Sequence, residues 1–169
     1  MLLAPTSGDV GVQPHGHTAR VINRSGGALA IGDLVVTSFA HSGVVYPATT
    51  TAETRLTPFS NVVKADGNAS PIPTGYLGAV VDLGSASGAN NTEVVVQFGG
   101  IVKCKATATS AISIGSSLGI SNTAGELQCD SASAFASTYP AAVALEAKAS
   151  GTAVINVLLV HDIWFGADV

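Results

Sequence analysis

Short apolar runs separated by turn-forming residues make up the hydrophobic pattern of this chain. Runs rich in Val, Ile and Leu alternate with clusters of Gly, Ser, Asn and Pro over most of the 169 residues. The 3.6-residue spacing of an amphipathic helix is nearly absent, because Gly and Ser/Thr-rich stretches interrupt it. Many short strands with turns between them predict an all-β protein, folded as a compact barrel or sandwich.

The predicted strands are rich in Val, Ile and Leu, and turn signals bound each of them. They cover residues 18–23, 34–38, 44–47, 77–82, 93–98, 101–106, 117–121, 142–146 and 153–161. Two stretches, 94–96 and 154–160, are apolar at nearly every position. This pattern predicts central strands that are buried on both faces.

Two segments lack the alternation that a strand needs. Residues 1–17 are punctuated by Pro5, Pro14 and three glycines, which predicts an extended N-terminal arm; a terminus without fixed structure is the alternative. Residues 46–74 carry four prolines and are predicted to form one long loop. A loop of that length inside a compact domain is uncommon and is often functional.

An internal repeat divides the chain into two similar halves, at about residues 20–101 and 102–163. The turn sequence Ile31-Gly32-Asp33 matches Ile114-Gly115-Ser116 at an offset of 114 − 31 = 83. Ala-Ser-Gly at 86–88 matches Ala-Ser-Gly at 149–151 at an offset of 151 − 88 = 63. The first half carries about twenty extra residues, which fall in the loop 46–74. Chance similarity in a composition dominated by Ala, Ser, Gly and Val is the alternative.

We expect the two halves to form a single β domain over residues 18–169. Neither half alone offers much apolar area, so the repeat predicts that both halves close one barrel or sandwich between them. Glycine supplies the positive φ that tight turns between such strands require.

The composition points to contact with another protein. Charged residues make up 11% of the chain, against roughly 25% in an ordinary soluble domain, and 47% of the residues are hydrophobic. A chain of this size cannot bury all of that apolar surface by itself. The net charge is −4 and the few cations are scattered, which argues against nucleic acid as a partner.

No membrane or export segment is predicted. No window approaches the roughly 20 apolar residues of a spanning helix, and the apolar start lacks a positively charged region. We therefore expect synthesis in a cytoplasm and no membrane partner. Cys104 and Cys129 are expected to be reduced thiols that act as small apolar residues, with one disulfide bridge as the alternative.

The chain contains one sequence that formally fits a catalytic motif. Gly115-Ser116-Ser117-Leu118-Gly119 matches G-x-S-x-G. The chemistry of that motif requires a strand before the serine, a helix after it, and acid and histidine partners. Here a strand-like segment follows and the repeat already explains Gly115 as a turn residue. We interpret the match as chance.

Other candidates for chemistry are equally weak, so the sequence predicts a protein that is not an enzyme and has no cofactor. His15 and His17 could supply two metal ligands, but a site needs about four and no further ligand has a suitable spacing. Asp82 and Glu146 occupy nearly equivalent places in the two halves, and we interpret them as surface charges at strand ends. No phosphate-binding or dinucleotide-binding loop is present.

The order of turns and strands resembles that of bacteriophage capsid decoration proteins, also called cement proteins. The resemblance rests on turn-strand segments at 31–36, 43–45, 78–81, 94–102, 114–120 and 151–160, and it covers about residues 18–163. It implies a tulip-like or jelly-roll-like β fold that binds the outer face of an icosahedral shell and stabilises it. The implied partners are the major capsid protein and two further copies in a homotrimer, and the implied location is the virion surface.

Two alternative functions remain open at this point. One is another virion component, such as a tail or fibre module that recognises a receptor. The other is an enzyme or a small-molecule binder. Cofractionation with heads or with tails separates the first alternative from a decoration protein.

The candidate contacts with a shell or partner are isolated apolar residues in the two irregular segments. They are Leu2, Leu3, Val10 and Val12 in the arm, and Leu56, Phe59, Val62 and Val63 in the loop. Proline lowers the entropy that such a segment loses when a partner orders it.

Overall fold

The computed structural model describes residues 17–37, 61–67, 75–129, 140–159 and 163–164. Strands dominate this part of the chain, and a single 3-10 turn, η2 (Gly84–Ala86), lies between two of them. The strands are β1 (His17–Asn23), β2 (Leu34–Thr37), β3 (Asn61–Lys64), β4 (Gly75–Asp82), β5 (Glu93–Phe98), β6 (Gly100–Ala108), β7 (Ser117–Ile120), β8 (Leu127–Gln128), β9 (Ala142–Ala144), β10 (Gly151–Leu159) and β11 (Ile163–Trp164). The predicted all-β class is confirmed.

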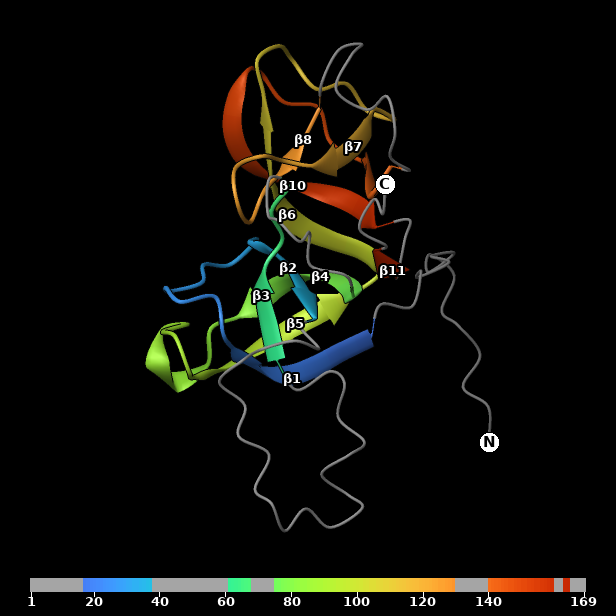
Figure 1. Ribbon diagram of the computed structural model, residues 1–169. Coiled ribbons are helices and arrows are strands. Elements are labelled where there is room, and N and C mark those ends of the chain that lie inside the picture. Colours follow the sequence, from blue (N-terminus) through green and yellow to red (C-terminus); the bar gives the residue numbers. More distant parts are fainter. Residues whose placement is uncertain (1–16, 38–60, 68–74, 130–139, 160–162, 165–169) are drawn as a thin grey trace, which may run out of the picture.

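The strands form two closed barrels, one stacked on the other (Figure 1). In the first barrel, β4-β2-β3-β1-β5 are neighbours in that order, and β5 pairs with β4 to close the ring. In the second barrel the order is β10-β6-β8-β7-β9, and β9 pairs with β10. Each barrel contains one parallel pair, β1 with β3 and β6 with β8, among antiparallel neighbours. The two halves therefore share one topology, as the repeat predicted.

The strand registers refine the alignment of the two halves. Leu34 pairs with Ala79 in the first barrel and Ser117 pairs with Val143 in the second. The offsets are 117 − 34 = 83 for the first partner and 143 − 79 = 64 for the second. The offset of 83 between β2 and β7 equals the offset that the Ile-Gly turns gave in the sequence. The offset of 64 between β4 and β9 is one residue larger than the 63 that the Ala-Ser-Gly turns gave.

Each half closes a barrel of its own, whereas the sequence predicted one barrel shared by both. Each half can close separately because a barrel of five strands encloses little space, which small side chains are sufficient to fill. The first core consists of Val21, Leu29, Val35, Val62, Val80, Val94, Val96 and Phe98. At Gly78 a Cβ would lie 2.5 Å from Val96 Cγ1 and 2.9 Å from Phe98 Cδ1, so glycine makes room there for the phenyl ring.

The second core extends beyond its own barrel. Residues of its strands, including Val102, Cys104, Leu118, Leu127 and Val157, form one cluster with the outer face of the first barrel. That outer face consists of Leu34, Val36, Leu77 and Ala79, on β2 and β4. All four residues of β2 are buried, since Val35 faces the first core while Leu34 and Val36 face the second barrel.

The strands buried on both faces are therefore not the ones predicted. On β5, Val94 and Val96 are buried but Val95 between them is only half-buried. On β10, Val154 is 43% exposed and the strand alternates from Ile155 onward. A continuous run of apolar residues did not predict which strands are buried on both faces. That burial depends on packing between the barrels, because the second barrel covers β2 and β4 from outside.

The predicted loop 46–74 contains a strand of the first barrel. β3 lies within it, with Val62 fully buried, and pairs with β1 and β2. The flanking prolines hid this four-residue strand from pattern analysis. The two-residue strands β8 and β11 were also missed, because so short a strand has no alternation to detect. The predicted strand 44–47 and residues 1–16 of the arm lie outside the described residues.

Asp33 joins the two barrels. Its carboxylate is 2% exposed and pairs with Lys64 of the first barrel at 3.2 Å and with Lys105 of the second. It also accepts a hydrogen bond from the Ala30 backbone N–H at 2.9 Å. A buried carboxylate is tolerable only when charges and donors surround it, as they do here.

Backbone hydrogen bonds hold the same junction. Lys105 N–H donates to the Gly32 carbonyl at 2.7 Å, and Leu34 N–H donates to the Gly125 carbonyl at 2.8 Å. Gly67 N–H donates to the Ser121 carbonyl at 2.9 Å. Gly125 and Ser121 belong to the turn between β7 and β8, so this turn is fastened along β2 and the end of β3.

Asp33→Asn is expected to lower the free energy of unfolding by about 2 kcal/mol, because it removes one charge from a buried cluster. This value allows for the lysines, whose side chains are 28–30% exposed and remain partly solvated. Chemical denaturation measures it. The matched control is Glu93→Gln, which breaks the exposed Arg20–Glu93 pair and should cost less than about 0.5 kcal/mol. Equal losses in the two variants would contradict the assigned role of Asp33.

Candidate interaction surface at the barrel junction

The structure describes only two of the eight predicted contact residues. Leu2, Leu3, Val10, Val12, Leu56 and Phe59 lie outside the described residues. Val62 is fully buried in the first core, so it is withdrawn as a surface contact. Val63 is half-buried and packs against the second core. Both positions follow from the alternation of β3, which points one valine into its own barrel and the next toward the neighbouring barrel.

The exposed large apolar side chains of the described residues are few and unevenly placed. They are Ile31 at 50%, Ile101 at 45%, Val154 at 43% and Ile114 at 70% exposure. Ile31 and Ile101 line one pocket. Val154 lies beside Gly32, where a Cβ would be 3.2 Å from Val154 Cγ2. Three of the four thus gather at the barrel junction, and Ile114 lies elsewhere.

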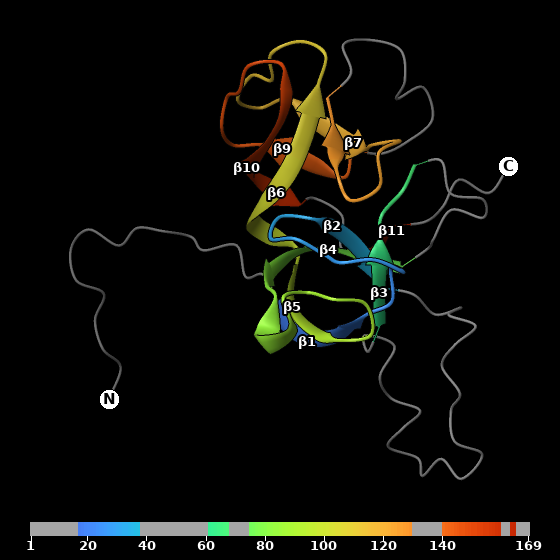
Figure 2. The ribbon, with the colours of Figure 1, turned by 90° about the vertical axis from the view of Figure 1, so that its left-hand side faces the viewer.

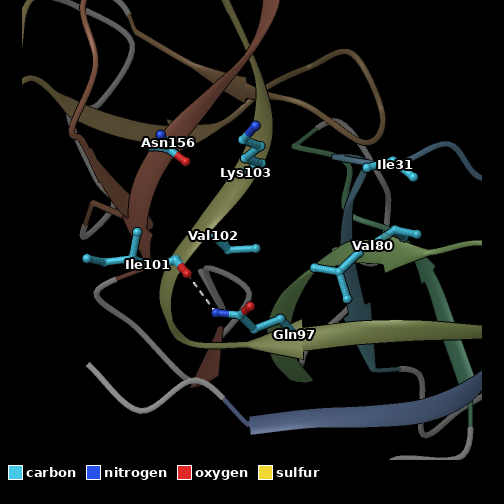
Figure 3. Close-up of a pocket in the computed structure, with 8 residues that line it drawn as sticks. Ile31, Val80, Gln97, Ile101, Val102, Lys103 and Asn156 are labelled. Carbon is cyan, nitrogen blue, oxygen red and sulfur yellow. Dashed lines mark hydrogen bonds between the residues drawn. The ribbon is translucent and has the colours of Figure 1, made fainter. Parts of the chain in front are cut away.

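The junction pocket is an open hollow of about 310 Å³ in the angle between the barrels (Figure 3). Its lining residues are Ile31, Val80, Val81, Gln97, Ile101, Val102, Lys103 and Asn156. They come from β4 and β5 of the first barrel, β6 and β10 of the second, and the turn before β2. Val80 and Val102 are buried and form the floor, whereas Ile31 and Ile101 are half-exposed walls.

Hydrogen bonds fix two of the three polar residues of this pocket. Gln97 Nε2 donates to the Ile101 carbonyl at 2.7 Å and to the Gly99 carbonyl at 3.3 Å, which ties down the connection between the barrels. Asn156 is held by Glu146, whose carboxylate accepts bonds from the backbone N–H at 3.0 Å and from the side-chain amide. Lys103 is exposed and places an ammonium group at the rim. The hollow is therefore already shaped before anything binds in it.

The described lining of the pocket is mostly aliphatic, with two amides and one ammonium group. Among the residues that the structure describes, the lining contains no carboxylate, imidazole, thiol or hydroxyl group, and Lys103 is the one titratable residue. Acid–base or nucleophilic catalysis requires such groups within hydrogen-bond reach of each other. Aliphatic walls with a few fixed amides instead fit an apolar side chain from a partner protein.

The G-x-S-x-G sequence does not form a nucleophile elbow. Gly115 has φ +86° in a turn, Ser117 begins β7, and the chain continues as a strand rather than a helix. Ser116 accepts a hydrogen bond from the Ser113 backbone N–H at 3.2 Å, as a turn residue does. The interpretation as a turn and strand is confirmed.

The two carboxylates at equivalent strand ends serve separate turns. Asp82 and Glu146 lie 146 − 82 = 64 residues apart in the sequence, which equals the offset between β4 and β9. Asp82 accepts a hydrogen bond from the Gly84 backbone N–H at 2.7 Å, whereas Glu146 holds Asn156. Each carboxylate therefore stabilises neighbouring residues of its own barrel by hydrogen bonds.

Metal ligation finds no support in the part of the chain that the structure describes. His17 begins β1 and His15 lies outside the described residues. Within those residues, no group of three or more His, Cys, Asp or Glu side chains gathers around a point.

Both cysteines are free thiols. Cys104 is buried in the second core and the half-buried Cys129 packs against the same cluster. Burial raises the pKa of the Cys104 thiol strongly, and the negative charge of Asp33 adds to the effect. The thiol is therefore protonated at neutral pH, which agrees with its prediction as a small apolar residue.

Sequence analysis overlooked Ile31 and Ile101 as surface residues because Ile31 shortly precedes a predicted strand and Ile101 begins one, so that both resemble core sequence. The signal that could have found one of them is the repeat. Ile31 and Ile114 precede the turn glycine in both halves, at a position where the strand has not yet begun. An apolar residue in a turn has no assigned face of a sheet, so its burial is not implied by alternation.

The chain matches no protein-family model, and no curated protein matches it. Among the described residues, no helix has the length and apolar character needed to cross a membrane.

Cys104 is expected to be unreactive toward a thiol reagent while the protein is folded. A Cys129→Ser variant leaves it as the sole thiol. At mildly alkaline pH, where an exposed cysteine forms thiolate, the raised pKa and the burial should block labelling until denaturant is added. Labelling of the folded variant at the rate of a free thiol would contradict the burial of Cys104.

Proposed function

We propose that this chain is a non-enzymatic structural protein of a virion, which binds the outer surface of a phage capsid and stabilises the shell. The proposal includes the major capsid protein as partner and association as a homotrimer. The observation that carries it is the junction pocket, where exposed aliphatic side chains surround a hollow with two amides fixed by hydrogen bonds. Such a surface fits a protein partner.

Two further observations support a role in assembly. The body consists of two barrels fixed to each other by Asp33 and by backbone bonds, so contacts made on one barrel are mechanically coupled to the other. The low charge and high apolar fraction favour extensive protein contact over a freely diffusing monomer. The resemblance to decoration proteins in the order of turns and strands supplies the capsid as the specific partner.

The location of the protein in purified particles tests the proposal directly. Cofractionation with heads is the expected result, and binding of the purified protein to undecorated heads should raise the temperature at which they disrupt. Recovery with tails or fibres would favour a receptor-binding module. Absence from particles would overturn the proposal.

Deletion of residues 1–16 is expected to weaken binding to undecorated heads by at least about tenfold, with unchanged folding of the barrels. The deletion leaves β1 whole, because that strand begins at His17, which pairs with Phe98. An extended segment can add backbone hydrogen bonds to a neighbouring sheet edge, and its loss removes them.

Comparison of head binding by the truncated and full-length proteins measures this effect, and thermal unfolding of each serves as control. A second truncation that also removes His17 and Thr18 tests the boundary, since it cuts into β1 and should lower stability as well. Equal binding by the full-length protein and the first truncation would show that the N-terminal segment does not contribute to head binding. The contact would then be assigned to the barrels.

A further inference from the structure

Ile114 is an isolated apolar knob on the second barrel. It is 70% exposed, the highest value among the large apolar side chains that the structure describes. The turn that carries it is well fixed, since Ser116 N–H donates to the Ser113 carbonyl at 3.1 Å and Gly115 N–H donates to the Ala144 carbonyl at 2.8 Å. A rigid, exposed aliphatic side chain loses little entropy on binding, which makes it an efficient anchor.

The same turn occurs in the first barrel with matching geometry. Gly32 and Gly115 both have φ +86°. Gly32 N–H donates to the Val80 carbonyl at 2.8 Å, which corresponds to the bond from Gly115 to Ala144. The two turns therefore present an isoleucine in the same way on two copies of one barrel.

In the first half this turn already docks on a barrel. Lys105 N–H donates to the Gly32 carbonyl, and Val154 packs against Gly32. Ile31 lies at the edge of that contact and forms a wall of the junction pocket (Figure 3). The internal contact uses Lys105 and Val154, and it leaves open the neighbouring pocket that is lined by Ile101, Val102, Lys103 and Asn156.

Ile114 cannot reach the junction pocket within its own chain. The pocket lies where β6 begins, at Ile101 to Lys103, whereas the Ile114 turn follows the end of β6 at Ala108. Seven residue steps along a strand separate Ile101 from Ala108, on the order of 20 Å. Figure 2 shows β6 running from the junction to the far end of the second barrel.

We infer that the Ile114 turn of one copy inserts its side chain into the junction pocket of a second copy. The knob and the pocket are different surfaces, so the contact is heterologous and leaves one knob and one pocket free in every dimer. A heterologous contact propagates until a ring closes, and a closed ring of three copies is the homotrimer of the proposed function. The inference itself concerns the isolated protein and requires no capsid.

Sedimentation velocity over a range from low to high micromolar concentration tests the contact. The knob variant is Ile114→Lys, which places a charge opposite apolar walls and Lys103. The pocket variant is Ile101→Lys, at a residue already 45% exposed. Each should weaken association at least about tenfold relative to the unaltered protein, while thermal unfolding stays unchanged. Ala89→Lys, at an exposed position of the first barrel, adds the same charge and should associate normally.

Mixing the two variants gives the sharpest result. The Ile101→Lys copy keeps its knob and the Ile114→Lys copy keeps its pocket, so an equimolar mixture should form dimers and nothing larger. A monomeric unaltered protein over the whole range, association unaffected by Ile114→Lys, or a mixture that assembles beyond dimers would each overturn the inference. None of these outcomes depends on head binding, so failure here is distinct from failure of the proposed binding to a capsid.

Discussion

The buried carboxylate of Asp33 is the contact on which the arrangement of the two barrels depends. It lies 2% exposed between Lys64 of one barrel and Lys105 of the other. Solvation lost on burial is replaced by two cations and one backbone donor, so the charge is tolerated only in this arrangement. A shifted or rotated second barrel would leave the carboxylate without Lys105. The charge therefore fixes the position of one barrel relative to the other, while apolar packing supplies most of the stabilisation.

The two halves have diverged where they meet. The outer face of the first barrel presents Leu34 and Val36 to the second core, whereas the corresponding residues of the second barrel (offset 83) are Ser117 and Gly119. Ser116 stands in the place of Asp33. In these positions the second barrel thus lacks the large aliphatic side chains and the charged anchor that the first barrel presents to its neighbour.

What the divergence left unchanged is the Ile-Gly turn. Both turns keep the same backbone conformation and project an isoleucine, although among the described residues only the first turn packs against the other barrel. The junction pocket arises from the meeting of the barrels, because its walls come from four strands of two halves. The interaction surface is therefore a product of the tandem arrangement, and a single barrel would not possess it. This connects the duplication to the proposed role as an assembly protein.

The amino-acid sequence was sufficient for the local features. Turn glycines such as Gly32 and Gly115 can be identified from the sequence because few other residues adopt positive φ. Alternation identifies long strands such as β5. The repeat followed from these features, and with it the two-fold plan of the all-β fold. The separate closure of each barrel, the strand β3 among the prolines and the double burial of β2 did not follow. Each of these depends on which segments become neighbours. Asp33 meets Lys105 across 72 residues, and no periodicity encodes that distance. The junction pocket is of the same kind, since its shape exists only after both barrels have closed and packed.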